Sequence, residues 1–202
     1  MDPNDTRTQP AEAVIIGHIE SYLGKVQEGW KPGGSNPEGG NITLVRYALE
    51  PNEDWVVLGS FGLSRLPLLQ PTGKELRQEI LVCWPEEEMT DSLLSHVYSV
   101  AQTIAVTGEA LGRGALLPLP SEPALNSGSD EPYVAWCAGV PYFLPQSGVL
   151  CEQVDPPMLL TWLMPVYENE AEFITAQGIE AFEDLVLASR ELMFSWPRKA
   201  LV

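Results

Sequence analysis

The sequence predicts a single α+β domain, in which a mixed or antiparallel β-sheet is packed with helices. The chain has 202 residues, 45% of them hydrophobic, which is enough to bury one sizeable core. Segments with the pattern of strands come in two groups of three, with helical segments before, between and after them. Strands grouped in this way, instead of alternating one by one with helices, are typical of α+β proteins. We expect the domain to span residues 11–188, between a flexible N-terminus (1–10) and a C-terminal tail (189–202).

The first half of the domain is predicted to contain one helix and three strands. Residues 11–26 have apolar side chains at helical spacing, and a loop rich in glycine and proline follows at 29–40. The three strands, rich in branched and aromatic residues, are expected at residues 42–49, 55–61 and 75–84. Pro85 ends the third strand, because proline cannot donate a main-chain hydrogen bond to a neighbouring strand.

The second half of the domain is predicted to open and close with helices. Thr90 is a candidate N-cap for a helix that ends near Gly108. Three further strands are expected at residues 116–119, 133–143 and 158–167, with a surface loop at 120–132. The last helical segment covers residues 168–187 and contains a break at Gly178.

The charge of the chain is strongly one-sided. There are 11 basic and 28 acidic residues, which gives a formal net charge of −17. Between residues 78 and 189 there are 17 acidic residues and a single basic one, Arg113. Such a balance disfavours nucleic acids and anionic membranes, which bind through lysine and arginine. The negative charge fits a protein that binds a basic partner, and it equally fits a protein whose acidic surface serves only to keep it in solution.

The sequence offers no candidate for a membrane span, a secretion signal, a disulfide or a metal site. Its longest apolar stretches fall far short of the roughly 20 residues that a spanning helix needs. The polar residues 1–10 lack the apolar core of a secretion signal. The three widely spaced cysteines, Cys83, Cys137 and Cys151, are expected to be small buried side chains in a reducing compartment. We therefore expect a cytoplasmic protein.

No catalytic residue and no cofactor are predicted either. The two histidines, His18 and His96, have no nucleophile motif beside them in the sequence. The glycines between Gly108 and Gly114 lack the Lys-Ser/Thr of a phosphate-binding loop. The most economical interpretation is a protein that is not an enzyme.

Three blocks of sequence resemble the suppressor of fused family, in its bacterial single-domain form. They are GSFGLS (59–64) with EILVCWP (79–85), then TG (107–108) with LGRG (111–114) and LPL (117–119), and finally WLMPVYENEAEF (162–173) with QGIEAF (177–182). The third block is the most specific, because a strand ending in Pro-hydrophobic-x-Glu-x-Glu before a helix is similar to the family pattern. The resemblance covers roughly residues 12–188 and implies an α+β sandwich around a mixed sheet.

The resemblance also implies a role in binding proteins. Animal members bind a short peptide of a transcription factor between two domains, partly by strand addition. This chain matches only the first of those domains. Many bacterial members resemble immunity proteins, which neutralise toxins encoded beside them. The family often has His or Asp after the last glycine of the second block, where this chain has Ala115, so the peptide-binding mode is not carried over.

The functional prediction is a non-enzymatic domain that binds a basic protein, such as a toxin or a nuclease, by stoichiometric occlusion. The candidate contact residues are Glu86, Glu87, Glu88, Asp130, Glu131, Glu168, Glu172 and Trp30. The acidic ones could face a partner's lysines, although those at helix starts also favour the helix dipole. Trp30 lies in a loop-like segment, where an exposed tryptophan can anchor an interface.

The sequence leaves two alternatives open. One is a regulator or scaffold that binds a peptide by strand addition, which would need an unpaired sheet edge. The other is a hydrolase that uses paired carboxylates, which would need a pocket in which acidic side chains converge.

Overall fold

The structure is a computed structural model that describes residues 10–31, 41–51, 54–119, 132–195 and 198–202. Two of the predicted contact residues, Asp130 and Glu131, lie outside the described residues. Among the described residues, no helix combines the length and the apolar character needed to cross a membrane.

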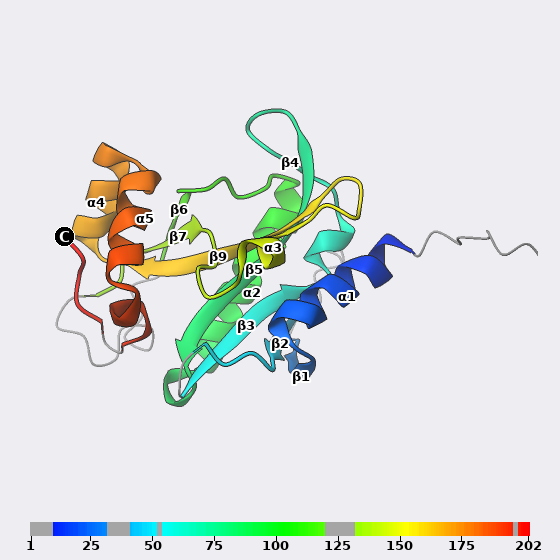
Figure 1. Ribbon diagram of the computed structural model, residues 1–202, viewed down its shortest axis with the longest axis horizontal. Coiled ribbons are helices and arrows are strands. Elements are labelled where there is room, and N and C mark those ends of the chain that lie inside the picture. Colours follow the sequence, from blue (N-terminus) through cyan, green and yellow to red (C-terminus); the bar gives the residue numbers. More distant parts are fainter. Residues whose placement is uncertain (1–9, 32–40, 52–53, 120–131, 196–197) are drawn as a thin grey trace, which may run out of the picture.

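A twisted, mixed β-sheet forms the centre of the described structure (Figure 1). Across it run β1 (Val26–Trp30), β2 (Thr43–Tyr47), β3 (Trp55–Phe61), β5 (Glu75–Pro85), β9 (Met158–Val166), β7 (Ala135–Gly139) and β6 (Leu116–Pro118). Two short strands extend it, β4 (Leu68–Leu69) beside β5 and β8 (Leu150–Cys151) beside β9. The two central strands, β5 and β9, are parallel, whereas the other pairs of neighbours are antiparallel. The predicted fold class is therefore confirmed.

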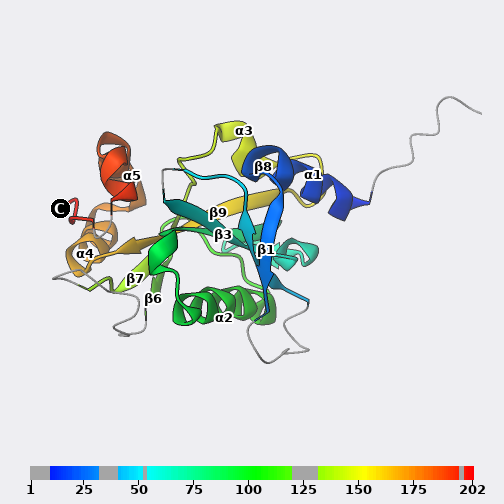
Figure 2. The same cartoon turned by 90° about the horizontal axis from the view of Figure 1, so that it is seen from below.

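Helices cover both faces of the sheet. The α-helices are α1 (Ala11–Leu23), α2 (Asp91–Thr107), α3 (Gln146–Val149), α4 (Glu168–Gln177) and α5 (Ile179–Ala188). Short 3-10 segments are η2 (Leu63–Arg65), η3 (Glu86–Glu88) and η5 (Arg190–Phe194). Figure 2 shows α2 below the sheet and α1, α3 and α5 above it. The sheet thus has a separate hydrophobic core on each face.

The strands contribute alternate residues to the two cores. In β3, Val57 joins the core under α1 and α5, whereas Val56 and Leu58 join the core over α2. Four tryptophans, Trp55, Trp84, Trp136 and Trp162, are buried as core residues. The three cysteines are buried as well, as the sequence predicts.

The amino-terminal edge of the sheet differs from the prediction. Helix α1 ends at Leu23, because Gly24 has a φ of 75° and a Cβ there would lie 2.8 Å from that of Ala48. The predicted loop at 29–40 also begins too early, since Gly29 and Trp30 belong to strand β1. Strand β1 is exposed along most of its length, so it lacks the alternation of apolar and polar residues that signals a strand.

Candidate functional site

Acidic residues gather where the two central strands end. Because β5 and β9 are parallel, their carboxyl ends lie at the same end of the sheet, and the antiparallel strands β2 and β3 bring their connection to that end too. We call this region the acidic end. It comprises Glu50, Asp54, Glu86, Glu87, Glu88, Asp91, Glu168 and Glu172. Five of the eight predicted contact residues are among them.

The first part of the acidic end is η3, which follows β5 directly. Its start is fixed by the Glu86 N–H, which donates to the Asp54 carbonyl at 2.8 Å. The Glu86 carboxylate forms a two-pronged ion pair with Arg46, and this pair lowers the pKa of Glu86. The Glu87 side chain is exposed, whereas Glu88 is half-buried and its carbonyl accepts a hydrogen bond from the Trp84 indole.

The second part of the acidic end is the first turn of α4. Glu168 and Glu172 are exposed and lie one helical turn apart, so they share a face of α4. They line a hollow of about 360 Å³ together with Pro132, Val134 and Asn169. The hollow is open to solvent, and its lining is half polar. It can therefore admit a side chain of a partner.

The two parts of the acidic end, η3 and the first turn of α4, follow strands that are no longer paired with each other where they end. The last paired residues of β5 and β9 are Leu81 and Trp162, and beyond them the two strands diverge (Figure 1). The acidic end is therefore a broad surface with two acidic clusters and not a closed site. Among the described residues, no group of three or more His, Cys, Asp or Glu could hold a metal ion.

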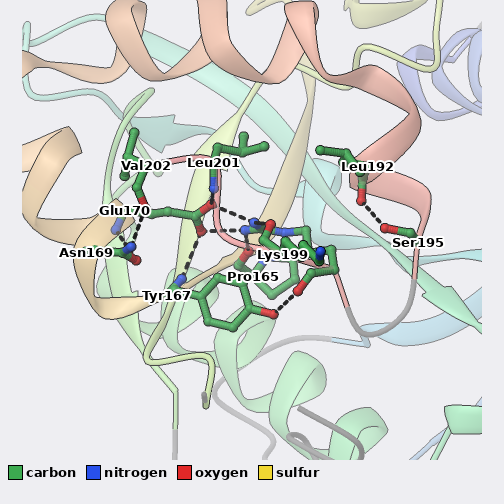
Figure 3. Close-up of polar contacts among 10 residues, drawn as sticks. Pro165, Tyr167, Asn169, Glu170, Leu192, Ser195, Lys199, Leu201 and Val202 are labelled. Atoms are coloured by element: carbon green, nitrogen blue, oxygen red, sulfur yellow. Dashed lines mark hydrogen bonds and ion pairs between the residues drawn. The ribbon is translucent and has the colours of Figure 1, made fainter. Parts of the chain in front are cut away.

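A buried ion pair fixes the position of the α4 cluster. Glu170 and Arg198 have side-chain exposures of 0% and 2%, and two guanidinium nitrogens donate to the carboxylate at 2.6 and 2.5 Å (Figure 3). The N–H groups of Tyr167 and Leu201 also donate to Glu170, each at 2.9 Å. Glu170 thereby caps α4 and holds the last residues of the chain against it, which sets where Glu168 and Glu172 point.

Few basic side chains compensate the acidic end. The exposed or half-buried basic residues described there are Lys25, Arg46 and Lys199, and the first two are in ion pairs with Glu20 and Glu86. At the opposite end of the sheet, Arg65, Lys74 and Arg77 lie among acidic residues such as Glu12, Glu75 and Glu109. The excess of negative charge is therefore greater at the carboxyl end of β5 and β9.

The structure does not bring Trp30 to this surface. Trp30 ends the edge strand β1, opposite Leu44, where its half-buried ring packs on the core beside α2. Three strands, β2, β3 and β5, separate that edge from β9. Trp30 thus remains a separate candidate contact.

Comparison with known proteins places the chain in a family. Residues 40–198 match the family model described as Suppressor of fused protein (SUFU). The chain belongs to the SUFU family. The similarity of the solved structures is confined to the fold. A SUFU homologue from Neisseria gonorrhoeae has a TM-score of 0.67 at 13% identity, over 95% of this chain and 96% of that one. A chain of the Sufu–Fu complex has a TM-score of 0.53 at 14% identity, over 88% and 84% of the two chains. No curated protein matches significantly.

In this SUFU domain, the first sequence block forms a buried polar cluster around Glu79. Both carboxylate oxygens of Glu79 are occupied: Ser60 donates to one at 2.5 Å, and Ser64 and the Gly62 N–H donate to the other. Burial raises the pKa of Glu79, and these hydrogen bonds oppose the rise. The neighbouring hollow measures about 10 Å³, which is room for one water at most. Glu79 therefore holds the β3–η2 turn and has no room to act on a substrate.

The second and third blocks of the SUFU domain meet at Arg113. Its guanidinium donates to Glu183, which is buried on α5, and lies 3.6 Å from Glu180. Gly114, with a φ of 83°, allows this approach, because a Cβ there would lie 2.9 Å from that of Ile179. The single basic residue of the acidic stretch is therefore paired with two acids of α5 and does not offset the exposed carboxylates of α4.

Sequence reasoning missed the contribution of Glu50, Asp54 and Asp91 to the acidic end. Glu50 and Asp54 lie in the connection between β2 and β3 and have no motif of their own, and Asp91 is the first residue of α2, where its charge also favours the helix dipole. The special role of Glu170 did have a signal. In the run Glu168, Glu170 and Glu172 the middle residue is two positions from each neighbour, which turns it to the opposite side of the helix.

Proposed function

We propose that this SUFU domain is a non-enzymatic binding protein that neutralises a basic toxin, such as a nuclease, by stoichiometric occlusion. The observation that carries the proposal is the acidic end, a broad exposed surface with eight carboxylates and few free basic groups. A surface of this kind accelerates encounter with a basic protein and can occupy a site built for phosphates. Many bacterial members of the family resemble immunity proteins, which neutralise toxins by binding them, and this favours a toxin as the partner.

The arrangement of carboxylates argues against the hydrolase alternative. The buried acids Glu79, Glu170 and Glu183 all have hydrogen-bond or ion-pair partners within the fold. Glu168 and Glu172 do line a hollow, but both are exposed and belong to the same helix turn. Paired carboxylate catalysis instead needs two acids on opposite sides of a substrate, in environments that separate their pKa values.

Co-expression with the product of the adjacent gene tests the proposal. We expect a one-to-one complex that survives size-exclusion chromatography at low salt, dissociates more readily at high salt, and suppresses the toxicity of the partner. Hydrolytic activity of the purified domain that is lost in Glu168→Gln, without any protein complex, would show that the hydrolase alternative is right.

Strand addition is a second candidate, favoured by the outer edge of β6, which pairs with no other described strand. Ala115 and Leu119 turn their main-chain groups toward β7, so by alternation those of Leu116 turn outward. Beside this edge, α2 and β6 enclose an apolar groove of about 380 Å³ that includes His96, Ile104 and Leu117. An extended peptide could pair with Leu116 and place side chains in the groove.

The two candidates predict different responses to Leu116→Pro. This exchange removes one outward N–H and leaves the acidic end unchanged, and an edge strand tolerates proline. Binding that survives Leu116→Pro but fails in Glu168→Lys favours the acidic end, and the reverse result favours strand addition.

A further inference from the structure

The outward face of α5 and η5 combines exposed leucines with carboxylates. Glu180, Asp184 and Leu187 are spaced by four and three residues, so they form one stripe along α5, and all three are exposed. The stripe is acidic near the start of the helix and apolar near its end. On η5, Leu192 is exposed as well, beside the exposed Glu191.

The core does not need these leucines. Helix α5 packs inward through Phe182 and Val186, which are 0% and 1% exposed, whereas Leu187 is 48% exposed. In η5, Met193 is buried, and the Phe194 ring lies 5.6 Å from Trp55 and 6.3 Å from Trp162. Leu192 remains 41% exposed. Two large apolar side chains thus face solvent from a segment that is firmly anchored.

This face adjoins the acidic end. After Gly178, α5 turns back and lies beside α4, so the end of α5 comes near the start of α4 (Figure 1). Its exposed carboxylates on Asp184 and Glu191 add to those of Glu168 and Glu172. The basic residues of this region are Arg113, which is paired with Glu183 and Glu180, and Arg190 at the start of η5, so acidic residues still outnumber basic ones. The charge therefore complements a basic ligand, and the leucines give that ligand an apolar contact.

We propose that the outward face of α5 and η5 is the docking surface for a basic amphipathic helix of the partner protein. Apolar side chains of that helix seat on Leu187 and Leu192, and its lysines or arginines meet Asp184 and Glu191. The inference rests on the proposed function: the acidic end governs encounter, and this apolar pair determines how long the complex lasts. A second copy of this chain is disfavoured as the occupant, since it would bring like charges together.

Nuclear magnetic resonance tests the surface without any knowledge of the partner. A synthetic amphipathic helix of lysine and leucine is titrated into the isotope-labelled protein, with a lysine–serine peptide of equal charge as control. We expect amide shifts centred on residues 184–194 with the first peptide, and weak, scattered shifts with the second. Shifts centred on the β6 groove or on η3, no shifts at all, or self-association through the leucines would overturn the proposal.

Matched variants then test the same surface in the complex with the co-expressed partner. Leu187→Ser and Leu192→Ser are each expected to raise the dissociation constant about three- to ten-fold, from the loss of a half-exposed leucine, chiefly through faster dissociation. Leu69→Ser and Val106→Ser are the controls, because these residues are 51% and 52% exposed and lie away from α5, near the junction of β4 with the end of α2. Equal effects of both pairs would refute the docking surface while leaving the proposed function intact. If no complex with the co-expressed protein forms, the proposed function is refuted. The docking surface is then still tested by the peptide titration, which does not need the partner.

Discussion

The ion pair between Glu170 and Arg198 gives the sharpest prediction on stability. Arg198→Met removes a guanidinium that is 2% exposed and leaves a fully buried carboxylate whose remaining donors, among the described residues, are the N–H groups of Tyr167 and Leu201. Breaking one side of such a pair costs about 3–5 kcal/mol. The exchange also removes the contact of the guanidinium with the Tyr167 ring, whose centroid lies 4.9 Å away. For a domain of this length, each kcal/mol lowers the melting temperature by about 2–4 °C, so we expect a fall of roughly 6–20 °C.

Urea unfolding followed by circular dichroism measures this loss. The double variant Glu170→Gln, Arg198→Met should recover part of it, because no buried charge then remains unpaired. Glu168→Gln is the control, since it changes an exposed glutamate on the same helix and should alter stability by less than about 0.5 kcal/mol. If Arg198→Met costs under about 1 kcal/mol, the segment from Arg198 to Val202 is not held as the structure shows.

Three further predictions concern the interior. Glu79→Gln should cost about 1–3 kcal/mol, because the amide NH₂ faces donors on Ser60, Ser64 and Gly62. Burial raises the pKa of Glu79 in the folded state above 4.5, so the folded state binds the proton more tightly than the unfolded state does. The free energy of unfolding of wild type, relative to that of Glu79→Gln, should therefore fall as the pH rises from the unfolded pKa through the folded pKa. A relative stability that rises with pH would contradict the raised pKa. Gly114→Ala should destabilise by about 1–3 kcal/mol through its positive φ and the clash with Ile179, whereas Gly112→Ala, with open space around it, should be nearly neutral in the same unfolding assay. Burial raises the pKa of Cys137 to about 12 and raises that of Cys83, so a thiol reagent at pH 8 should label these two cysteines only after unfolding; rapid labelling of the native protein would show that they are accessible.

Much of the fold follows from local patterns in the sequence. Strand β3 lies at residues 55–61 as predicted, Thr90 accepts a hydrogen bond from the Leu93 N–H as the N-cap of α2, and Gly178 separates α4 from α5. These features depend on neighbours in the chain, such as branched residues, a hydroxyl before a helix, or a glycine with positive φ. Strand β1 was missed because an exposed edge strand has no apolar alternation.

The candidate site depends on contacts that local patterns do not contain. Glu86 and Glu168 are far apart in the sequence, and they reach the same end of the sheet because β5 pairs with β9 in parallel, an arrangement without a local signal. The spacing of four residues between Glu168 and Glu172 does predict that they share a face of a helix. It gave no sign that Arg198 would be buried against Glu170, since arginine is rarely buried and this one lies near the end of the chain.

The association rate constant with the co-expressed partner tests the central claim most directly. Glu168→Lys with Glu172→Lys reverses two charges at the acidic end, and Glu109→Lys with Glu152→Lys makes the same change in net charge at the opposite end of the sheet. By stopped-flow at low salt, we expect the first variant to associate at least about ten-fold more slowly and the second to remain close to wild type, with the difference shrinking as salt is added. Equal slowing by the two variants would mean that net charge alone matters, and would contradict a docking surface at the acidic end.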